Sequence, residues 1–403
     1  MKTGRNRGEM PRKQSLISGK PQLNRRINAS LVFSLIQEEG PLSRPDLAAR
    51  TGVRLTSISD IVDQLLEEDI VQEIGEGEST GGRRPVLLDI NPKGRFAVGI
   101  EIAEDAINGV VVDLSGEVVT SQSTALSSTK VSTVQSKAES LIASLTNKSK
   151  ARKKQVAGIG VAAPGIISKD ERRVVLSTAL NWEDVDFLDN LQRATKQTVR
   201  LVNNAMAGAL GAYFDRPKPR VRSLLYVLTY LAHVRQTQLT SLGCGIVLDG
   251  RAYFGEGSLA GEIRVDLEHP VETAKKRMGK HAPARISTLI KESAKDPSTY
   301  SSVWDDFAGN LGEIISRGID FLSPGLVVIG SDIPELGSLI GDKVRTVTRR
   351  RTIAGLLSNH GSNREAVPLH FSPIEPYTIA RGAVVPYLQE LSLAPLLRDS
   401  VLS

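Results

Sequence analysis

The sequence predicts an α/β protein built in two parts: a small N-terminal unit of helices with a β-hairpin, and a larger unit of alternating strands and helices. Two observations support this prediction. Between Ser43 and Ile90, two helical patterns joined by Gly52 are followed by two apolar runs with a Gly-rich turn between them. From Arg95 onward, short β-branched runs alternate with segments of helical periodicity, which is typical of α/β domains.

Three helices are expected in the N-terminal unit. The first covers residues 27–37, where apolar residues recur on one face, and Gly40 and Pro41 end it. The second has Ser43 as N-cap and Pro45 in its first turn, and it ends at Gly52. The third carries an apolar stripe that must pack inward, formed by Ile58, Ile61, Val62, Leu65 and Leu66.

Two helices joined by a tight glycine turn, with hydroxyl side chains near the start of the second, form a helix-turn-helix that fits the DNA major groove. The runs 70–74 and 86–90, on either side of a turn with two arginines, complete it as a hairpin wing. We therefore expect a winged helix-turn-helix over residues 24–90 that binds a double-stranded DNA operator. An ordinary helical hairpin with a basic loop is the alternative.

The residues expected to contact DNA come from the second helix, the third helix and the wing. Hydroxyl groups of the third helix would contact base edges or phosphates, arginines near the two helix starts would reach phosphates, and wing arginines would enter or flank the minor groove. The residues are Arg44, Arg54, Thr56, Ser57, Ser59, Arg83 and Arg84. Asp60 and Leu55 depart from this pattern. Because one recognition helix reads only a few base pairs, a homodimer on a two-fold operator is expected.

The composition is that of a folded, soluble protein and narrows the function classes. The chain has 403 residues, of which 40% are hydrophobic and 24% charged, and its mean hydropathy is −0.12. Its apolar stretches are shorter than the roughly 18 residues of a membrane span, so no membrane association is expected. Cys244 is the only cysteine, which excludes intramolecular disulfides and multi-cysteine zinc sites and fits a reducing cytoplasm. No cofactor is expected.

Residues 1–23 are expected to form a basic, flexible tail. The net charge of the chain is +6, and residues 1–26 carry eight Lys or Arg side chains against Glu9. Such an arm beside a helix-turn-helix would neutralise phosphates and add salt-dependent affinity that carries no sequence information. A leader that only aids solubility is the alternative.

The larger unit is expected over residues 95–403 as two lobes, the second beginning at about residue 205. A turn at 91–94 separates it from the wing, and a meander of three strands over 96–121 opens it. The further helices are expected near 131–145, 205–213, 286–294, 303–321 and 335–349, and from 378. The further strands are expected near 156–161, 199–202, 223–228, 244–248, 326–329 and 367–371.

Seven short motifs, in this order, resemble those of one protein family. They are LSRPDLA at 42–48, GGRRP at 81–85, GIGVAAPG at 158–165, NNA at 203–205, GEI at 261–263, SPGLVVIG at 323–330 and RGA at 381–383. From about Asn24 to Leu388 the chain is similar to the transcriptional-regulator branch of the ROK family, which holds repressors, uncharacterised reading frames and sugar kinases. The resemblance implies a two-lobed, actin-like (ribonuclease H-like) ATPase fold behind the DNA-binding domain.

Four ATP-related segments depart from the kinases of this family. The first phosphate turn, 99–105, has Ala103 where a glycine is expected and two carboxylates beside it. Asn204 replaces the family's catalytic Asp, and loss of a general base slows a reaction by about 10²- to 10⁴-fold. The second phosphate segment, 229–237, lacks glycines, and Ser331 replaces a glycine of the adenosine turn. We therefore expect no catalytic residues and no kinase activity.

The resemblance also implies a sugar pocket without a metal. Asn203 matches the family's hydroxyl-binding Asn, and Glu262 matches the carboxylate that accepts hydrogen bonds from sugar hydroxyls. Both could instead be structural residues of a remodelled cleft. Val265 stands where the family has a zinc-binding His, the cysteine cluster is missing, and His269 is a lone histidine. Trp182, near the cleft, is expected in the core.

These expectations describe a DNA-binding regulator of the repressor type that responds to a sugar or sugar phosphate. The ligand would change lobe and dimer geometry, a coupling of about 1 to 3 kcal/mol. Two alternatives stay open: a sugar kinase that has kept a DNA-binding leader, and a constitutive DNA-binding protein with an inert dimerising domain. Binding of ATP would indicate the first, and the lack of any ligand response the second.

Overall fold

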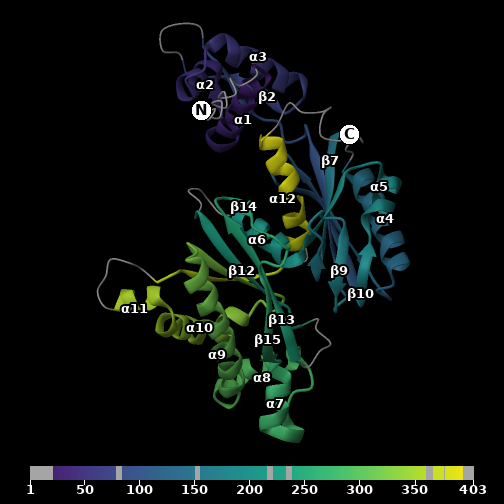
Figure 1. Ribbon diagram of the computed structural model, residues 1–403, viewed down its shortest axis with the longest axis vertical. Helices are drawn as coiled ribbons and strands as arrows, with labels where there is room; N and C mark the ends of the chain where they lie inside the picture. Colours follow the sequence, from purple (N-terminus) through teal and green to yellow (C-terminus); the bar gives the residue numbers. More distant parts are fainter. Residues whose placement is uncertain are drawn as a thin grey trace, which may run out of the picture. The chain divides into compact units, whose positions relative to one another are not determined.

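The computed structural model describes residues 21–78, 84–149, 155–215, 221–232, 238–359, 366–375 and 377–393 (Figure 1). The chain divides into two compact units, of which the second runs from Pro92 to Leu388. The first comprises the residues up to Asn91 together with those from Gln389 onward. Residues 1–20 of the expected tail and Arg83 of the expected wing lie outside the described residues.

Helices and a small antiparallel sheet make up the first unit. Its elements are α1 (Pro21–Glu39), β1 (Leu42–Ser43), α2 (Arg44–Thr51), α3 (Leu55–Glu67), β2 (Val71–Glu76) and β3 (Val86–Ile90). The strands lie in the order β1-β3-β2. The stripe expected on α3 is buried except for Leu66, which is half-buried, and α3 is in contact with α1, where Phe33 is also buried. This arrangement is a winged helix-turn-helix, and α1 begins at Pro21 rather than near residue 27.

Local signals fix the two ends of α2. The Ser43 hydroxyl accepts a hydrogen bond from the Asp46 amide at 3.3 Å, and the Asp46 carboxylate accepts one from the Ser43 amide at 3.0 Å. This capping box satisfies N–H groups that have no partner inside the helix. At the other end Gly52 has a φ of 70°, in the left-handed region that favours glycine. The N-cap and glycine turn expected from the sequence are both confirmed.

The second unit opens with a mixed sheet. Its strands are β4 (Phe96–Ile102), β5 (Ala106–Asp113), β6 (Val118–Ala125), β7 (Val156–Ala163) and β11 (Val199–Asn203), in the order β11-β7-β4-β5-β6. The expected meander is confirmed by the antiparallel pairs of β5 with β4 and β6, whereas β7 runs parallel to β4 and β11. The remaining elements of this lobe are α4 (Val131–Lys148), α5 (Leu188–Thr195), β8 (Ile166–Ile167), β9 (Arg173–Ser177) and β10 (Trp182–Asp186).

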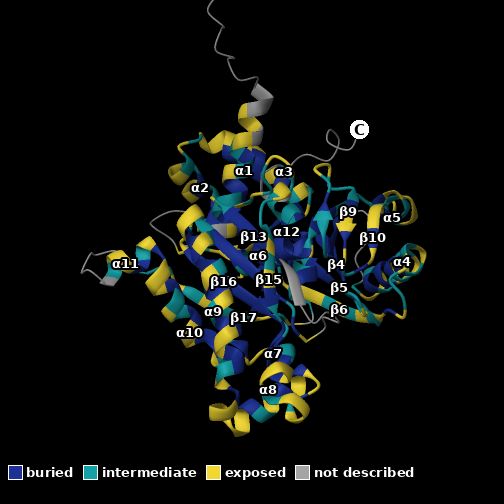
Figure 2. Cartoon of the chain, turned by 60° about the horizontal axis from the view of Figure 1, so that its bottom comes forward, coloured by how far each residue is buried: buried dark blue, intermediate teal, exposed yellow. Residues whose placement is uncertain are grey.

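A second sheet and most of the helices form the other lobe. Its strands are β12 (Ser223–Thr229), β13 (Gln238–Leu248), β14 (Arg251–Ala252), β16 (Leu326–Ser331) and β17 (Leu369–Pro373), in the order β14-β13-β12-β16-β17, and β15 (Glu262–Glu268) pairs with β13. The helices are α6 (Asn204–Phe214), α7 (Pro270–Met278), α8 (Ile286–Lys295), α9 (Pro297–Leu322), α10 (Leu336–Arg351), α11 (Ile353–Asn359) and α12 (Thr378–Leu393). Figure 2 shows β16 buried, while α9 and α10 expose their outer faces.

Helices α6 and α12 pack between the two sheets of the second unit (Figure 1). A Cβ atom added at Gly99 or Gly160 of the first sheet would lie 2.0 Å from the carbonyl oxygen of Ala380 or Ala383 in α12. A Cβ at Gly382 would lie 1.8 Å from the carbonyl oxygen of Ala207 in α6. Glycine at these positions therefore allows the first sheet to approach α12, and α12 to approach α6, closely.

Several elements of the second unit were not expected from the sequence, among them the small sheet β8–β10, strand β15 and helix α7. The small sheet places Trp182 in the core, where it is 3% exposed and stacks on Phe187 at a ring distance of 5.5 Å. The prediction that Trp182 is a core residue is confirmed.

Candidate functional sites

The exposed face of α3 carries short polar side chains near its first turn. Thr56 and Ser57 are exposed and Ser59 is half-buried, because the helix turns its Ile58 side towards the core. Among the described residues no side chain caps the amide groups at the start of α3, where Arg54 is the N-cap. These amides and the helix dipole make the start of α3 attractive to a phosphate oxygen.

Arg44 lies between the recognition helix and the wing. Its guanidinium donates to the carboxylate of Asp63 in α3 at 2.8 Å and to that of Glu73 in β2 at 3.3 Å. All three side chains are partly exposed, so these ion pairs contribute little stability and can exchange for a phosphate. By pairing with Asp63 and Glu73, Arg44 also offsets the charge of two carboxylates that would otherwise repel the DNA backbone.

Of the two wing arginines, Arg84 is described and exposed, just before β3. Asp60 is exposed on the same side of α3 as Ser57 and makes no ion pair with any described residue. A carboxylate at this position can only accept hydrogen bonds, and in the major groove it can accept one from the amino group of cytosine.

The second candidate site is where β11 meets β15. Asn203 is the N-cap of α6, and its side-chain oxygen accepts hydrogen bonds from the amides of Ala205 at 2.7 Å and Met206 at 3.4 Å. Its side-chain nitrogen donates to the carbonyl of Gly165 at 2.7 Å and to the carboxylate of Glu262 at 3.0 Å. The structure therefore brings together the two residues expected to bind a sugar, and Asn203 orients Glu262.

Glu262 retains acceptor capacity in this arrangement. Only its Oε1 atom takes part in the bond to Asn203, and Oε2 has no partner among the described residues. Burial raises the pKa of the Glu262 carboxyl above its ordinary value of 4.5. The carboxylate borders a cavity of about 200 Å³ whose lining includes Met206, Phe254, Ser258 and Lys169. A cavity with an apolar wall and a few polar groups is suited to a small polyol.

Two acids, the buried Glu101 and the half-buried Asp332, bond to the segments where kinases of the family were expected to hold phosphates. Glu101, which is 5% exposed, accepts hydrogen bonds from the Tyr230 hydroxyl at 2.7 Å and the Asn108 amide at 3.1 Å. Burial and the nearby Glu101 carboxylate raise the pKa of Tyr230 well above its ordinary value. Asp332 accepts from the backbone amides of Leu231 at 2.8 Å and Ala232 at 2.9 Å. Amides of the second phosphate segment are thus already bonded to a carboxylate.

These acid contacts were missed by the sequence reasoning, which noted only the two carboxylates beside Ala103. Partners that are 129 residues apart, as Tyr230 and Glu101 are, leave no local signal in the sequence.

His269 has a structural role, since its Nδ1 accepts a hydrogen bond from the Val271 amide at 3.3 Å to cap α7 and its Nε2 lies 3.0 Å from the Leu231 carbonyl. Asn204, in place of the catalytic Asp, is buried.

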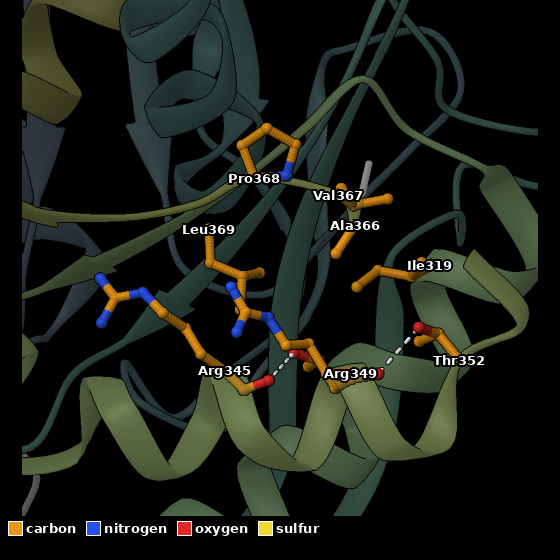
Figure 3. A pocket seen from close by; sticks show the side chains of 9 residues that line it. Ile319, Arg345, Arg349, Thr352, Ala366, Val367, Pro368 and Leu369 are labelled. Atoms are coloured by element: carbon orange, nitrogen blue, oxygen red, sulfur yellow. Dashed lines mark hydrogen bonds between the residues drawn. The ribbon is translucent and has the colours of Figure 1, made fainter. Parts of the chain in front are cut away.

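Another cavity, of about 270 Å³, lies between α10 and β17 (Figure 3). Arg345 and Arg349 come from successive turns of α10 and lie beside Leu369 and Pro368. Arg345 is partly satisfied by Asp342 at 3.3 Å and by the ring of Phe371, whose centroid is 5.7 Å away.

Among the described helices, none combines the length and apolar character that a bilayer span needs.

Comparison with known proteins gives the family of this fold and site. The family model described as "ROK family" matches residues 97–264. The xylose repressor of Bacillus subtilis (strain 168) is 30% identical over 363 residues, which cover 85% of this chain and 91% of that protein. The chain therefore belongs to the ROK family. The DNA-binding transcriptional dual regulator NagC of Escherichia coli (strain K12) is 21% identical over 397 residues, covering 91% of this chain and 95% of that protein.

Solved structures agree on the fold. A ROK family transcriptional regulator described as a homolog of the E. coli MLC protein superposes with a TM-score of 0.73 at 18% identity, covering 92% of this chain and 98% of that one. A ROK family glucokinase from Streptomyces griseus, in complex with glucose and AMPPNP, has a TM-score of 0.57 at 17% identity and covers 72% of this chain and 97% of that one. The two-lobed, actin-like fold predicted for the larger unit is confirmed.

Proposed function

We propose that this protein is a DNA-binding transcription regulator of the repressor type, whose second unit binds a sugar or sugar phosphate beside Asn203 and Glu262. The observation that carries the proposal is the winged helix-turn-helix, which exposes Thr56 and Ser57 at the start of α3. Relatives over most of the chain are named xylose repressor and N-acetylglucosamine repressor. Such a protein acts on DNA in the cytoplasm.

The DNA contacts follow from the exposed polar groups of the first unit. Thr56, Ser57 and Ser59 read base edges or phosphates from the major groove, and Arg54 and Arg44 neutralise phosphates on either side. Arg84, together with Arg83 of the wing, enters or flanks the minor groove. The tail over residues 1–23 adds affinity that depends on salt but carries no sequence information.

The ligand contacts follow from the acceptor capacity of Glu262. A carboxylate with one oxygen oriented by Asn203 and the other without a partner in the described part of the chain can accept hydrogen bonds from two sugar hydroxyls. Pentoses such as xylose are the first ligands to test, because the repressor at 30% identity is named for that sugar.

Kinase activity is the second candidate, since ROK hexokinases and glucokinases share the fold. Two contacts and one substitution argue against it in this chain. Glu101 places a buried carboxylate at the first phosphate segment, Asp332 bonds to amides of the second, and Asn204 cannot act as the general base. Like charges in a buried site repel a triphosphate strongly.

A DNA selection tests the proposed function. The full-length protein is incubated with a random duplex pool, bound duplexes are amplified, and the affinity for the enriched sequence is compared with that for a shuffled sequence. A regulator binds the enriched site about 10³-fold or more tightly than the shuffled duplex at the same salt concentration. Equal affinities for the two duplexes would leave a DNA-binding protein without an operator and overturn the proposal.

A further inference from the structure

The cavity of about 270 Å³ between α10 and β17 is separate from the two sites that the fold implies (Figure 3). It lies at the start of β17, where Leu369 pairs with Val327, whereas Ser331 of the adenosine turn pairs with the last residue of β17. None of the residues that line it borders the cavity beside Glu262. A ligand of this cavity is therefore bound apart from the sugar beside Glu262.

Two arginines one helical turn apart stand beside this cavity. Arg345 and Arg349 are four residues apart on α10, so both side chains project from the same face of the helix, on the side of β17 (Figure 3). Like charges at this spacing repel each other and weaken a helix. An anion bound between the two guanidinium groups would remove this repulsion.

Arg345 is held in place by its surroundings. Its Cζ atom lies 5.7 Å from the centroid of the Phe371 ring, and Gly341 leaves room for the guanidinium, since a Cβ atom there would lie 2.9 Å from Nη1. Its ion pair with Asp342, at 3.3 Å, involves a fully exposed carboxylate and contributes little. An arginine stacked on an aromatic ring is already oriented, so it loses little conformational freedom when it binds an anion.

Arg349 is available to a ligand. It is exposed and makes no ion pair with any residue that the structure describes. Its neighbour Arg351, by contrast, pairs with Glu313 of α9 at 2.9 Å. Positive charges at the end of a helix offset the helix dipole, and Arg350 and Arg351 already supply such charges. The dipole therefore accounts for basic residues at the end of α10, but not for two guanidinium groups beside a cavity.

The other groups around the cavity leave an anion to the two arginines. The Thr348 hydroxyl donates to the Arg345 carbonyl at 3.0 Å, and the Thr352 hydroxyl donates to the Thr348 carbonyl at 2.8 Å (Figure 3). Each hydroxyl has one proton, so neither can donate to a ligand as well. None of the described residues that line the cavity carries a carboxylate. The opposite wall is apolar and is formed by Ile319, Val367, Pro368 and Leu369.

We propose that this cavity binds a small phosphate monoester. The guanidinium groups of Arg345 and Arg349 donate charge-assisted hydrogen bonds to the phosphate oxygens, and the carbon body of the ligand lies against Val367 and Leu369. A phosphate monoester loses its second proton at a pH of about 6, so at neutral pH it carries nearly two negative charges, which balance the two arginines. A carboxylate would balance only one. The inference goes beyond the proposed function and does not depend on the binding of DNA or sugar.

The test is isothermal titration calorimetry of the full-length protein with phenyl phosphate at neutral pH, without DNA or sugar, in a buffer free of phosphate and sulfate. We expect R345Q and R349Q each to weaken binding by about ten-fold or more, because each removes hydrogen bonds to a charged group. R350Q is the matched control, since it removes the same charge from the same helix but Arg350 is exposed and does not line the cavity. It should bind phenyl phosphate as the native protein does. Circular dichroism checks that each variant is folded.

Two further probes identify the class of ligand. Inorganic phosphate should bind more weakly than phenyl phosphate, and V367S should reduce this difference, because the ring lies against the apolar wall. Benzoate, which carries one negative charge, should bind about ten-fold more weakly than phenyl phosphate.

Three results would overturn the proposal. The first is a native protein that does not bind phenyl phosphate, or an R345Q or R349Q protein that binds it as tightly as the native one. The second is an R350Q protein weakened as much as R349Q, which would indicate attraction to the charge of the helix as a whole. The third is benzoate or inorganic phosphate that binds as tightly as phenyl phosphate, which would exclude a monoester as the preferred ligand.

Discussion

Two carboxylates of the second unit, the buried Glu101 and the half-buried Glu262, differ in how their oxygens are satisfied. Glu101 accepts hydrogen bonds from Tyr230 and Asn108, so it is a structural acceptor. Among the residues that the structure describes, Glu262 is held through Oε1 by Asn203 alone. At the scale of single residues, we therefore propose Glu262 as the group on which ligand binding depends, whereas Glu101 is an internal structural acceptor.

The first prediction concerns Glu262 and pH. Because burial raises the pKa of this carboxyl above 4.5, the group takes up a proton at a higher pH than an exposed glutamate. Sugar affinity is full above the raised pKa and falls as the pH is lowered through it, because the protonated group loses an acceptor. E262Q should weaken sugar binding by about ten-fold or more and remove this pH dependence in calorimetric titrations, while E183Q, at an exposed position of β10, should change neither.

The same pKa shift has an opposite effect on folding. A glutamate whose pKa is raised in the folded state lowers the stability of the fold above that pKa, and this penalty disappears as the pH falls below the ordinary 4.5.

A sugar affinity that stays constant from neutral pH down through the acid range, or an E262Q protein that keeps the native sugar affinity, would contradict the assignment of Glu262 as the ligand-binding carboxylate.

The second prediction concerns the contact between Tyr230 and Glu101. Y230F removes a donor from a buried carboxylate, which should lower the free energy of unfolding by about 1 to 3 kcal/mol in urea titrations. Tyr253 is 46% exposed, so Y253F is the matched control and should leave the unfolding midpoint unchanged. Equal stabilities of Y230F and Y253F would mean that Glu101 does not need this hydrogen bond.

At the scale of elements, the start of α2 depends on the Ser43 hydroxyl. S43A should destabilise the first unit by about 0.5 to 2 kcal/mol, the usual effect of losing an N-cap. The hydrogen bonds from Ser43 lower the pKa of Asp46 below 3.8, so their contribution is present at neutral pH and is lost as the pH falls through the lowered pKa. The measurement is chemical unfolding followed by circular dichroism, with S136A on the exposed face of α4 as the control.

The start of α3 gives a prediction for DNA binding. T56A/S57A should weaken binding to the selected operator by roughly ten-fold or more and leave binding to shuffled DNA nearly unchanged, because hydrogen bonds to bases carry the sequence information. R54Q should weaken binding to every duplex and lower the slope of affinity against salt by about one. R251Q, an exposed arginine of the second unit, is the control. Fluorescence anisotropy at several salt concentrations measures both effects.

Local sequence signals were sufficient for elements that depend on neighbouring residues. The cap at Ser43, the turn at Gly52 and the buried stripe of α3 follow from spacing within a few residues. The small sheet β8–β10 and strand β15 could not be predicted in this way, because short strands are stabilised by pairing with distant segments rather than by their own pattern. Helix α7 was missed because its N-cap is a histidine, His269, which is not among the usual capping residues.

In the candidate sugar site, too, local motifs could be predicted from the sequence and long-range contacts could not. Asn203 and Glu262 were expected from motifs, but their mutual hydrogen bond joins residues 59 positions apart and required the folded chain. The contacts of Glu101 with Tyr230 and of Asp332 with Leu231 are longer in range still. A sequence read without its fold therefore identifies which phosphate-binding residues are replaced, but not what the replacements contact.

At the scale of the whole molecule, the chain joins a DNA-binding unit to a unit with the fold of ROK kinases, in which Glu101 and Asp332 accept internal hydrogen bonds. Ligand binding to such a chain should raise its melting temperature, since a ligand that binds only the folded state stabilises it. A sugar should therefore raise the melting temperature and ATP should not. An increase in melting temperature with ATP and magnesium would indicate a sugar kinase instead.

The most direct test of the central claim measures operator affinity with and without sugar. The selected duplex is titrated with the full-length protein by fluorescence anisotropy, first alone and then with xylose and a panel of other sugars at saturating concentration. We predict that one sugar lowers operator affinity by about 5- to 150-fold, the range of a coupling of 1 to 3 kcal/mol, and that E262Q loses this response while it keeps its affinity for the operator. An operator affinity that no sugar changes would contradict the regulator with a ligand pocket and support a constitutive DNA-binding protein.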